Sequence, residues 1–184
     1  KSDAPSIWIE YVAMMENMCN PETIQVMISD RAPELIYGTL ERFNRQRGIR
    51  MAPTAARSQS NNAPAEAAIL WIMNAIRSVL LHARMPSSCW SLALKHVTRT
   101  RNMLPNRGSC FAPMSPVQAL TGVTPDWSRT KVFGCIGVAH IDKETRNDKS
   151  LSPRGTPCRM LAYGPGRTGT YLVLLPGRKM RYVR

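Results

Sequence analysis

The order of apolar and polar residues along the first half of the chain predicts alternating helices and strands. Residues 5–20 place apolar side chains at helical spacing, and the pair Asn20-Pro21 ends that pattern. Residues 23–29 form a short apolar run that is typical of a buried strand. Residues 34–47 return to helical spacing and close on Gly48, a residue favoured just after a helix. Residues 49–52 are expected to form the next strand, so the alternation indicates an α/β layer structure.

The second half changes from helical patterns to short β-type runs. Residues 54–62 have no periodicity and are expected to be a loop, after which a long helix begins near Pro64. One apolar stripe on that helix is predicted to be buried: Ile69, Ile72, Met73, Ile76, Val79 and Leu80. A further helix is expected over residues 87–103. From Val132 onward, short apolar runs divided by Gly and Pro predict a small β-barrel. We therefore expect two domains, residues 1–125 and 126–184.

The charge balance is strongly positive and points to a polyanionic partner. The chain has 25 Lys and Arg against 12 Asp and Glu, a formal net charge of +13. Such an excess repels itself in a compact chain, so nucleic acid is the first candidate partner and an acidic membrane surface the second. From Asp126 onward there are 12 basic and 4 acidic residues. The last third is therefore predicted to be a basic tail domain that follows a less basic main domain.

Cysteine and histidine usage argues against a disulfide framework and against a structural zinc site. The five cysteines are widely spaced without a CxxC pair, which argues against a disulfide framework and predicts a reducing intracellular location, nuclear or cytoplasmic. None of the three histidines pairs with a cysteine at zinc spacing. No signal peptide and no apolar run of transmembrane length are recognised, so no membrane partner is expected.

Two acids hold positions that suit a catalytic metal site. Asp30 ends a predicted strand and Glu66 lies in the first turn of the long helix, with 35 residues between them. The carboxyl edge of an α/β sheet is where ligands usually bind, and two carboxylates there could hold Mg²⁺ or Mn²⁺. An acid after a strand also caps helices, and an acid in a first helical turn is favoured by the helix dipole. From the residues alone, both interpretations stay open.

Several strings along the chain together resemble the integrase of copia-type LTR retrotransposons. "SDRAPEL" keeps Ser29, Asp30 and Glu34 of the family's "SDNGxEF" string, and "NNAPAEA" keeps Asn62, Ala65 and Glu66 of "NGVAER". "LLHARMPSSCWSLAL", the stretch ending in "VFGC", and "LSPRGTPCRMLAYG" follow the family in the same order. The resemblance covers nearly the whole chain.

This resemblance implies a ribonuclease-H-like integrase core that processes the 3′ ends of element DNA and joins them to target DNA. Asp30 and Glu66 would then be catalytic residues sharing two Mg²⁺ or Mn²⁺ ions with a third carboxylate. That third acid is expected upstream of Lys1, so the chain is interpreted as the later part of the core followed by a small basic barrel. The implied partners are element-end and target DNA, and a homo-oligomer.

Three departures from the family pattern indicate a degenerate copy. Arg31-Ala32 replaces Asn-Gly, which removes a residue that easily adopts positive φ beside the metal. Ala67 replaces an Arg, which removes a phosphate contact. Ala63-Pro64 replaces Gly-Val and stiffens the start of the helix. Catalysis by this chain alone is therefore not expected, and a domesticated binding module or a structural relic are the alternatives.

Two groups of residues are candidates for nucleic-acid contact. Gln59, Asn61 and Asn62 lie in the loop before Glu66, where the family contacts DNA ends, although ordinary loop composition explains them nearly as well. Arg178, Lys179 and Arg181 lie close together near the C-terminus and are predicted to bind phosphates without sequence preference. A third basic group, around the helix over residues 34–47, fits a solvated helix face better.

Overall fold

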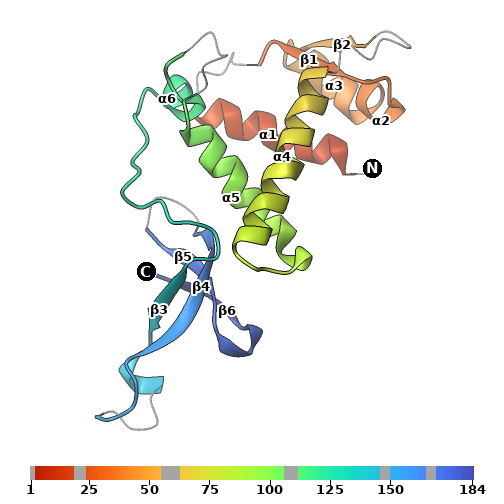
Figure 1. The fold of residues 1–184 in the computed structure, drawn as a ribbon. Helices are drawn as coiled ribbons and strands as arrows, with labels where there is room; N and C mark the ends of the chain where they lie inside the picture. Colours follow the sequence, from red (N-terminus) through yellow and green to blue (C-terminus); the bar gives the residue numbers. More distant parts are fainter. Residues whose placement is uncertain (1–2, 19–23, 55–62, 106–111, 146–149, 165–168) are drawn as a thin grey trace. The chain divides into compact units, whose positions relative to one another are not determined.

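The chain folds into two compact units of mixed α/β structure. The computed structural model describes residues 3–18, 24–54, 63–105, 112–145, 150–164 and 169–184 (Figure 1). Unit 1 comprises Lys1–Leu70 with Gln118–Val123, and unit 2 comprises Trp71–Val117 with Thr124–Arg184. The chain passes from one unit to the other first inside the long helix α4 (Ala63–His82), then between Val117 and Gln118, and again between Val123 and Thr124, close to the predicted boundary.

Unit 1 is built around a pair of parallel strands. Its elements are α1 (Ala4–Met18), β1 (Val26–Ser29), α2 (Pro33–Ile36), α3 (Thr39–Gln46) and β2 (Arg50–Pro53). The strands pair in register from Val26↔Arg50 to Ser29↔Pro53, with α2 and α3 forming the crossover between them. The buried residues that pack together are Val12, Met27, Leu40 and Ile49. The predicted α/β alternation is confirmed here.

The predicted helix over residues 34–47 is wrong in one respect, because it is two helices. The break falls at Tyr37 and Gly38, where Gly38 takes φ 78° and ψ −129°. This left-handed φ is reached easily only by glycine, and it redirects the chain between α2 and α3. Gly48 has the expected role after the helix: its φ is 68°, and its N–H donates to the Arg45 carbonyl.

A buried amide ties the elements of unit 1 together. Asn44 on α3 is fully buried, and its Oδ1 accepts a hydrogen bond of 2.9 Å from Nε1 of Trp8 on α1. Its Nδ2 lies 3.3 Å from the sulfur of Met27 on β1. Because a buried amide costs free energy unless it is paired, these contacts fix α3 against both neighbours.

Unit 2 packs two helices on an antiparallel sheet. After the C-terminal part of α4 come the 3-10 helix η2 (Ser87–Cys89) and α5 (Trp90–Met103). The sheet follows chain order: β3 (Ile136–His140), β4 (Gly155–Tyr163), β5 (Tyr171–Leu174) and β6 (Met180–Val183). Two 3-10 helices, η3 (Lys143–Thr145) and η4 (Pro176–Arg178), lie between strands. A short helix that the pattern did not predict, α6 (Pro116–Thr121), bridges the two units in sequence.

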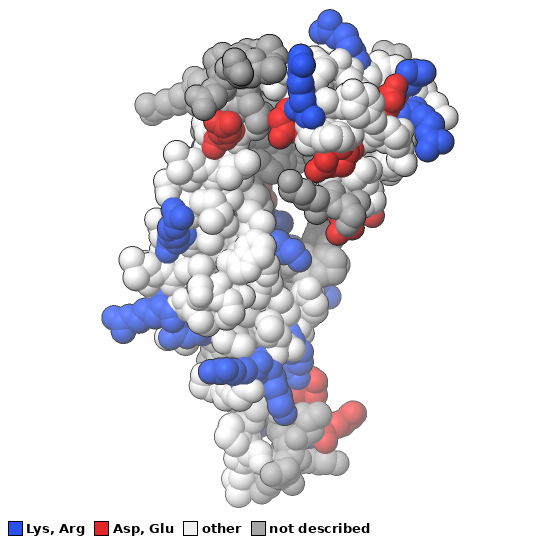
Figure 2. All heavy atoms as spheres, turned by 90° about the vertical axis from the view of Figure 1, so that its right-hand side faces the viewer, with Lys and Arg blue, Asp and Glu red and all other residues white. Residues whose placement is uncertain are grey.

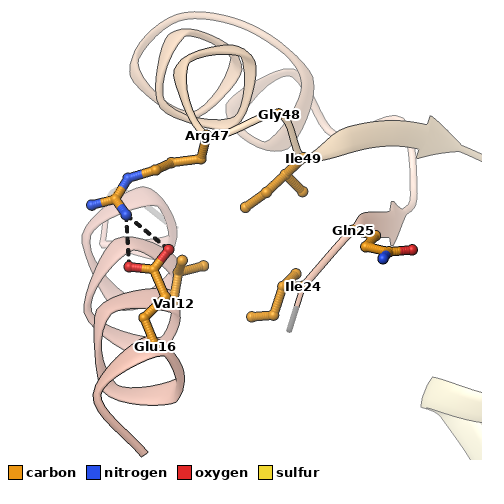
Figure 3. Close-up of a pocket in the computed structure, with 7 residues that line it drawn as sticks. All are labelled: Val12, Glu16, Ile24, Gln25, Arg47, Gly48 and Ile49. Carbon is orange, nitrogen blue, oxygen red and sulfur yellow. Dashed lines mark hydrogen bonds and ion pairs between the residues drawn. The ribbon is translucent and has the colours of Figure 1, made fainter. Parts of the chain in front are cut away.

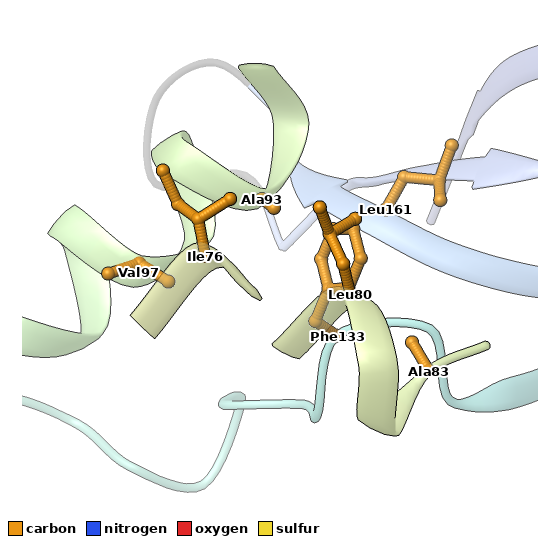
Figure 4. Packing of buried hydrophobic residues seen from close by; sticks show 7 residues of the cluster. All are labelled: Ile76, Leu80, Ala83, Ala93, Val97, Phe133 and Leu161. Carbon is orange, nitrogen blue, oxygen red and sulfur yellow. The ribbon is translucent and has the colours of Figure 1, made fainter. Parts of the chain in front are cut away.

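The core of unit 2 joins α4, α5, the segment before β3, and β4. Ile76 and Leu80 from α4 meet Phe133 and Leu161 at its centre, with Ala93 and Val97 from α5 beside them (Figure 4). The guanidinium of Arg159 adds a polar tie, because Nη1 donates 2.8 Å to the carbonyl of Ala83 at the end of α4. Packing of this kind gives unit 2 its own hydrophobic core.

Only the C-terminal half of the predicted α4 stripe is buried. Ile76 and Leu80 are buried, and Ile72 and Val79 pack beside them, whereas Ile69 and Met73 are exposed. By length and composition alone, α4 is also apolar enough to cross a membrane, which the search for apolar runs overlooked. Core helices of soluble proteins pass the same test.

The predicted closed barrel is not formed by the described residues. The sheet has β3 and β6 as its two edges, with no pairing between them. The edges do approach at one point, since Nη2 of Arg181 on β6 donates 2.7 Å to the carbonyl of His140 on β3. Ala139, Cys158 and Val173 form a small apolar cluster within the sheet. The result is an open antiparallel sheet with a side-chain tie between its edges.

His96 on α5 predicts a pH-dependent stability for unit 2. The side chain is 8% exposed, its Nδ1 has no hydrogen-bond partner among the described residues, and its ring stacks on Tyr163 and meets Phe133 edge-on. Burial lowers the pKa of His96, and the neighbouring Arg99 lowers it further. Because the unfolded chain takes up the proton first, stability is full above about pH 6.5 and falls as the pH drops toward the lowered folded pKa.

Urea denaturation at pH 7.5 and pH 5 tests this expectation. His96→Leu is expected to flatten the pH dependence, whereas His82→Gln, a change at an exposed histidine of the same unit, is expected to leave it intact. Equal pH dependence in the two variants would rule out His96 as the cause.

Candidate active site and nucleic-acid surface

Asp30 lies at the carboxyl edge of the β1–β2 pair and takes part in the turn into α2. It directly follows β1, and its carboxylate is exposed. Its Oδ1 accepts a long hydrogen bond, 3.4 Å, from the N–H of Ala32, the residue that precedes α2. Asp30 does not cap α2 as the sequence allowed, because the N-cap residue is Ala32 and no side chain caps this helix; its bond to Ala32 belongs to the turn before the helix. An exposed carboxylate with one weak bond is still able to reach a cation.

Arg31 occupies the same edge and ties the two strand ends together. Its Nε donates 2.9 Å to the carbonyl of Thr54, and the N–H of Thr54 donates 2.9 Å to the carbonyl of Ser29. The residue that replaces the family's Asn therefore has a structural role at the edge.

Glu66 lies in the first turn of α4 and belongs to unit 1, as Asp30 does. Its side chain is exposed and makes no hydrogen bond or ion pair with another described residue. Among the described residues, no three His, Cys, Asp or Glu side chains gather to hold a metal. The two carboxylates have the oxygen ligands that Mg²⁺ prefers, but these residues do not complete a two-cation site. Gln59, Asn61 and Asn62 lie outside the described residues.

A pocket of about 280 Å³ in unit 1 lies away from these acids. Val12, Ile24 and Ile49 contribute its apolar wall (Figure 3). Arg47 and Glu16 lie together on one side of it, where Nη1 of Arg47 donates to both carboxylate oxygens of Glu16 at 2.8 and 2.7 Å. Because the pair satisfies both charges, the pocket presents no unpaired charge to a ligand.

Two of the four arginines around α3 pair with acids of their own unit. Arg47 pairs with Glu16, and Arg45 pairs with Glu41 at 2.7 Å one helical turn away. These surface pairs favour the interpretation of a solvated helix face over a phosphate-binding track.

The positive charge of the chain is concentrated in unit 2. Unit 1 contains 7 Lys and Arg against 8 Asp and Glu, whereas unit 2 contains 18 against 4. Figure 2 shows acidic and basic side chains mixed over unit 1, and mostly basic ones over unit 2. The candidate metal ligands, Asp30 and Glu66, therefore belong to unit 1, whereas the excess of Lys and Arg that would attract a polyanion belongs to unit 2.

The C-terminal cluster supplies two of the exposed cations. Arg178 is the last residue of η4 and Lys179 links it to β6, and neither forms an ion pair or side-chain hydrogen bond with another described residue. Gly177 and Arg178 both have positive φ, 76° and 60°, which shapes this turn. Arg181 is also exposed, but its guanidinium donates a hydrogen bond to the His140 carbonyl and so links β6 to β3.

Two arginines stacked on aromatic rings were missed by the sequence analysis. The guanidinium of Arg99 lies 4.1 Å from the centre of the Tyr163 ring, and that of Arg101 lies 4.2 Å from the centre of the Trp71 ring. Such stacking holds an arginine in place while its N–H groups still face solvent. The available signal was the pair of arginines on one helix, "TRTR", but their aromatic partners are distant in sequence.

Comparison with known proteins decides the family. No protein-family model matches the chain. It is 30% identical over 141 residues to the Retrovirus-related Pol polyprotein from transposon TNT 1-94 of Nicotiana tabacum, which is 77% of this chain and 10% of that protein. This chain derives from a copia-type retrotransposon. The relationship to copia-type retrotransposons that its motifs predicted is thereby confirmed.

Two further comparisons place the copia-derived chain among its relatives. It is 24% identical over 163 residues to the Retrovirus-related Pol polyprotein from transposon RE2 of Arabidopsis thaliana, covering 89% of the chain and 11% of that protein. The chain thus spans about a tenth of the length of these relatives. Among solved structures, a chain of the simian T-cell lymphotropic virus intasome in complex with PP2A regulatory subunit B56 gamma matches with 14% identity and a TM-score of 0.48, covering 99% of this chain and 61% of that one.

Proposed function

We propose that this chain is a nucleic-acid-binding part of a copia-type integrase, and that unit 2 carries the binding. The observation that supports this is the charge division, with 18 basic and 4 acidic residues in unit 2. Phosphate contacts by Lys and Arg release counterions from DNA, which makes binding favourable without base recognition. In this proposal unit 1 is part of a ribonuclease-H-like core, and the β3–β6 sheet corresponds to the small barrel of the family.

Binding to DNA would use the exposed cations of unit 2. Arg178 and Lys179 have their charges unpaired, and the guanidinium groups of Arg99 and Arg101 are held on aromatic rings. Pre-positioned arginines lose less side-chain entropy when they meet a phosphate. A homo-oligomer on two DNA ends is part of the same proposal, as the family resemblance implies.

In the complete reaction, Asp30 and Glu66 would act as ligands for Mg²⁺ or Mn²⁺, with a third carboxylate supplied by another segment. The cations would supply activation of the attacking oxygen and stabilisation of the leaving one. Within this chain, Asp30 would direct its carboxylate outward from the strand edge. The chain alone is therefore expected to bind DNA without processing or joining it.

A strand-transfer assay tests the catalytic part of the proposal. With labelled duplex DNA and Mg²⁺ or Mn²⁺, no joined product above the level without protein is expected. Strand transfer by this chain that Glu66→Gln abolishes would contradict the expectation and show a complete site.

A binding module without any catalytic role is the second candidate, and the turn at Asp30 favours it. The carboxylate of Asp30 accepts the Ala32 N–H, which gives this acid a structural role without a metal. Under this candidate, Asp30→Asn leaves DNA affinity within twofold of the wild type. The same result is expected if the chain carries an incomplete catalytic metal site, so this variant does not separate the two candidates. Adding an upstream Pol segment that carries a carboxylate separates the two, because only an incomplete site gains metal-dependent activity.

A further inference from the structure

Among the described strands, β3 has one edge with no strand beside it. In the sheet order β3-β4-β5-β6 the one described neighbour of β3 is β4. Two bonds fix which residues face that neighbour: the Met160 N–H donates 3.0 Å to the Cys135 carbonyl, and the Ile141 N–H donates 3.0 Å to the Arg154 carbonyl. In an antiparallel ladder the bonding residues alternate, so Gly137 and Ala139 also face β4. The backbone groups of residues 136, 138 and 140 therefore point to the open side.

The side chains along this edge are apolar and unprotected. Ile136 and Val138 are each 76% exposed, and the sequence of β3, "IGVAH", has no charged residue and no proline. Protein edges are usually protected by charges, proline or a bulge, because unpaired backbone groups template another strand. Val138 also lies directly over Gly155 of β4, where any added Cβ would collide with it. The edge is thus an uninterrupted strand surface with a defined apolar face.

One end of the edge is already closed. The carbonyl of His140 accepts the Arg181 hydrogen bond from β6, which leaves Ile136 and Val138 as the residues whose outward backbone groups have no bond with another described residue. An extended segment at this edge would therefore pair chiefly across residues 136–138. A short contact of this type derives its affinity from the backbone and its selectivity from side chains on alternate positions.

Charge identifies the kind of segment that fits. Arg159 lies opposite Ile136 in the register, Arg181 lies at the His140 end, and unit 2 has 18 basic residues against 4 acidic ones. A second copy of this chain would bring two strongly positive units together, which the repulsion opposes. Nucleic acid has no amide backbone that could continue the ladder. An extended peptide with apolar and acidic residues in alternation matches both the strand face and its charge.

We propose that the open edge of β3 binds an extended acidic segment of a partner protein by adding it to the sheet as a fifth strand. The interaction uses the backbone of Ile136 and Val138 and covers their side chains. It requires neither DNA nor the carboxylates of unit 1, although the positive charge of unit 2 that favours an acidic segment is the same charge that is proposed to bind DNA.

The proposal is tested with the full chain and a capped peptide of sequence VEVEVEV. Titration followed by amide NMR is expected to show saturable binding, with slowed hydrogen exchange at the Ile136 and Val138 amides. The peptide VKVKVKV, which keeps the strand propensity and reverses the charge, is expected to bind at least about tenfold more weakly. Equal binding of the two peptides, or no protection at these amides, would overturn the proposal.

A matched pair of variants locates the contact. Val138→Lys is expected to weaken binding of VEVEVEV about tenfold although it adds a positive charge, because it disrupts the apolar face of the edge. Leu151→Lys makes the same change at a residue that is 87% exposed and outside β3, and is expected to have less than about a twofold effect. Equal effects, or a dimer in sedimentation that Val138→Lys dissolves, would contradict a peptide partner. All of these measurements are made without DNA, so failure of the proposed nucleic-acid function would not affect them.

Discussion

Replacing Phe133 by alanine is expected to lower the free energy of unfolding of unit 2 by about 3–5 kcal/mol. Phe133 is almost fully buried between Ile76 and Leu80 of α4 and Leu161 of β4 (Figure 4). Its ring also meets that of His96 on α5 at a centroid distance of 5.6 Å. One side chain thus holds both helices on the sheet, and its loss leaves a cavity that none of these elements can fill by a small movement.

Urea denaturation measures the effect, and the neighbouring residue provides the control. Val132→Ala also shortens an apolar side chain, but Val132 is 59% exposed, so a change within about 0.5 kcal/mol is expected. Because a domain of this size is stabilised by about 5–15 kcal/mol in total, Phe133→Ala is also expected to weaken DNA binding at 37 °C. Similar destabilisation by the two variants would show that the ring is not the centre of the core.

Raising the salt concentration from 50 to 200 mM is expected to lower the affinity for duplex DNA by about 10³-fold. The exposed basic residues described in unit 2 include Arg178, Lys179, Arg154 and Lys131, and a duplex lying on one face reaches only part of the whole set. We assume that unit 2 contacts about six phosphates of the duplex, and each contact contributes about −0.9 to the slope of log K against log salt. Fluorescence anisotropy with a labelled duplex at several KCl concentrations measures this slope.

Sequence independence is the accompanying expectation. Phosphate contacts do not read bases, so two duplexes of equal length and different sequence should bind within about threefold of each other. An affinity that hardly changes with salt would mean that the positive charge of unit 2 does not face DNA.

Local patterns predicted the individual elements well, because each reports its own periodicity. The strand β1 and the helix α5 lie within the expected ranges, and the helix α1 and the strand β2 each extend one residue beyond theirs. The break at Gly38 was missed because helical spacing continues across it, although a glycine in the middle of a predicted helix was the available signal.

What the sequence did not predict depends on contacts between distant segments. Periodicity identified the apolar face of α4 but not how much of that face other elements would bury. Phe133 packs against Ile76 and Leu80, whereas Ile69 stays exposed. Strand-like runs were recognised, but closure of a barrel depends on whether β3 and β6 pair, which no local pattern encodes.

The same reason explains the distribution of charge and the candidate site. Counting along the chain gave the C-terminal third a large share of the positive charge, yet α5 folds with the sheet and adds Arg99 and Arg101 to it. Asp30 and Glu66 were identified from spacing and from family resemblance. The role of Arg31 depends on its bond to Thr54, 23 residues away, which only the structure shows.

The most direct test of the account compares the salt slopes of two double variants that remove the same charge. Arg178→Ala with Lys179→Ala neutralises two unpaired cations of unit 2, and Arg42→Ala with Arg45→Ala neutralises two cations of unit 1. The first is expected to reduce the slope of log K against log salt by about 1.8, and the second to leave it unchanged. Equal slopes for the two variants, or a larger change for the pair in unit 1, would contradict the claim that unit 2 carries the nucleic-acid binding.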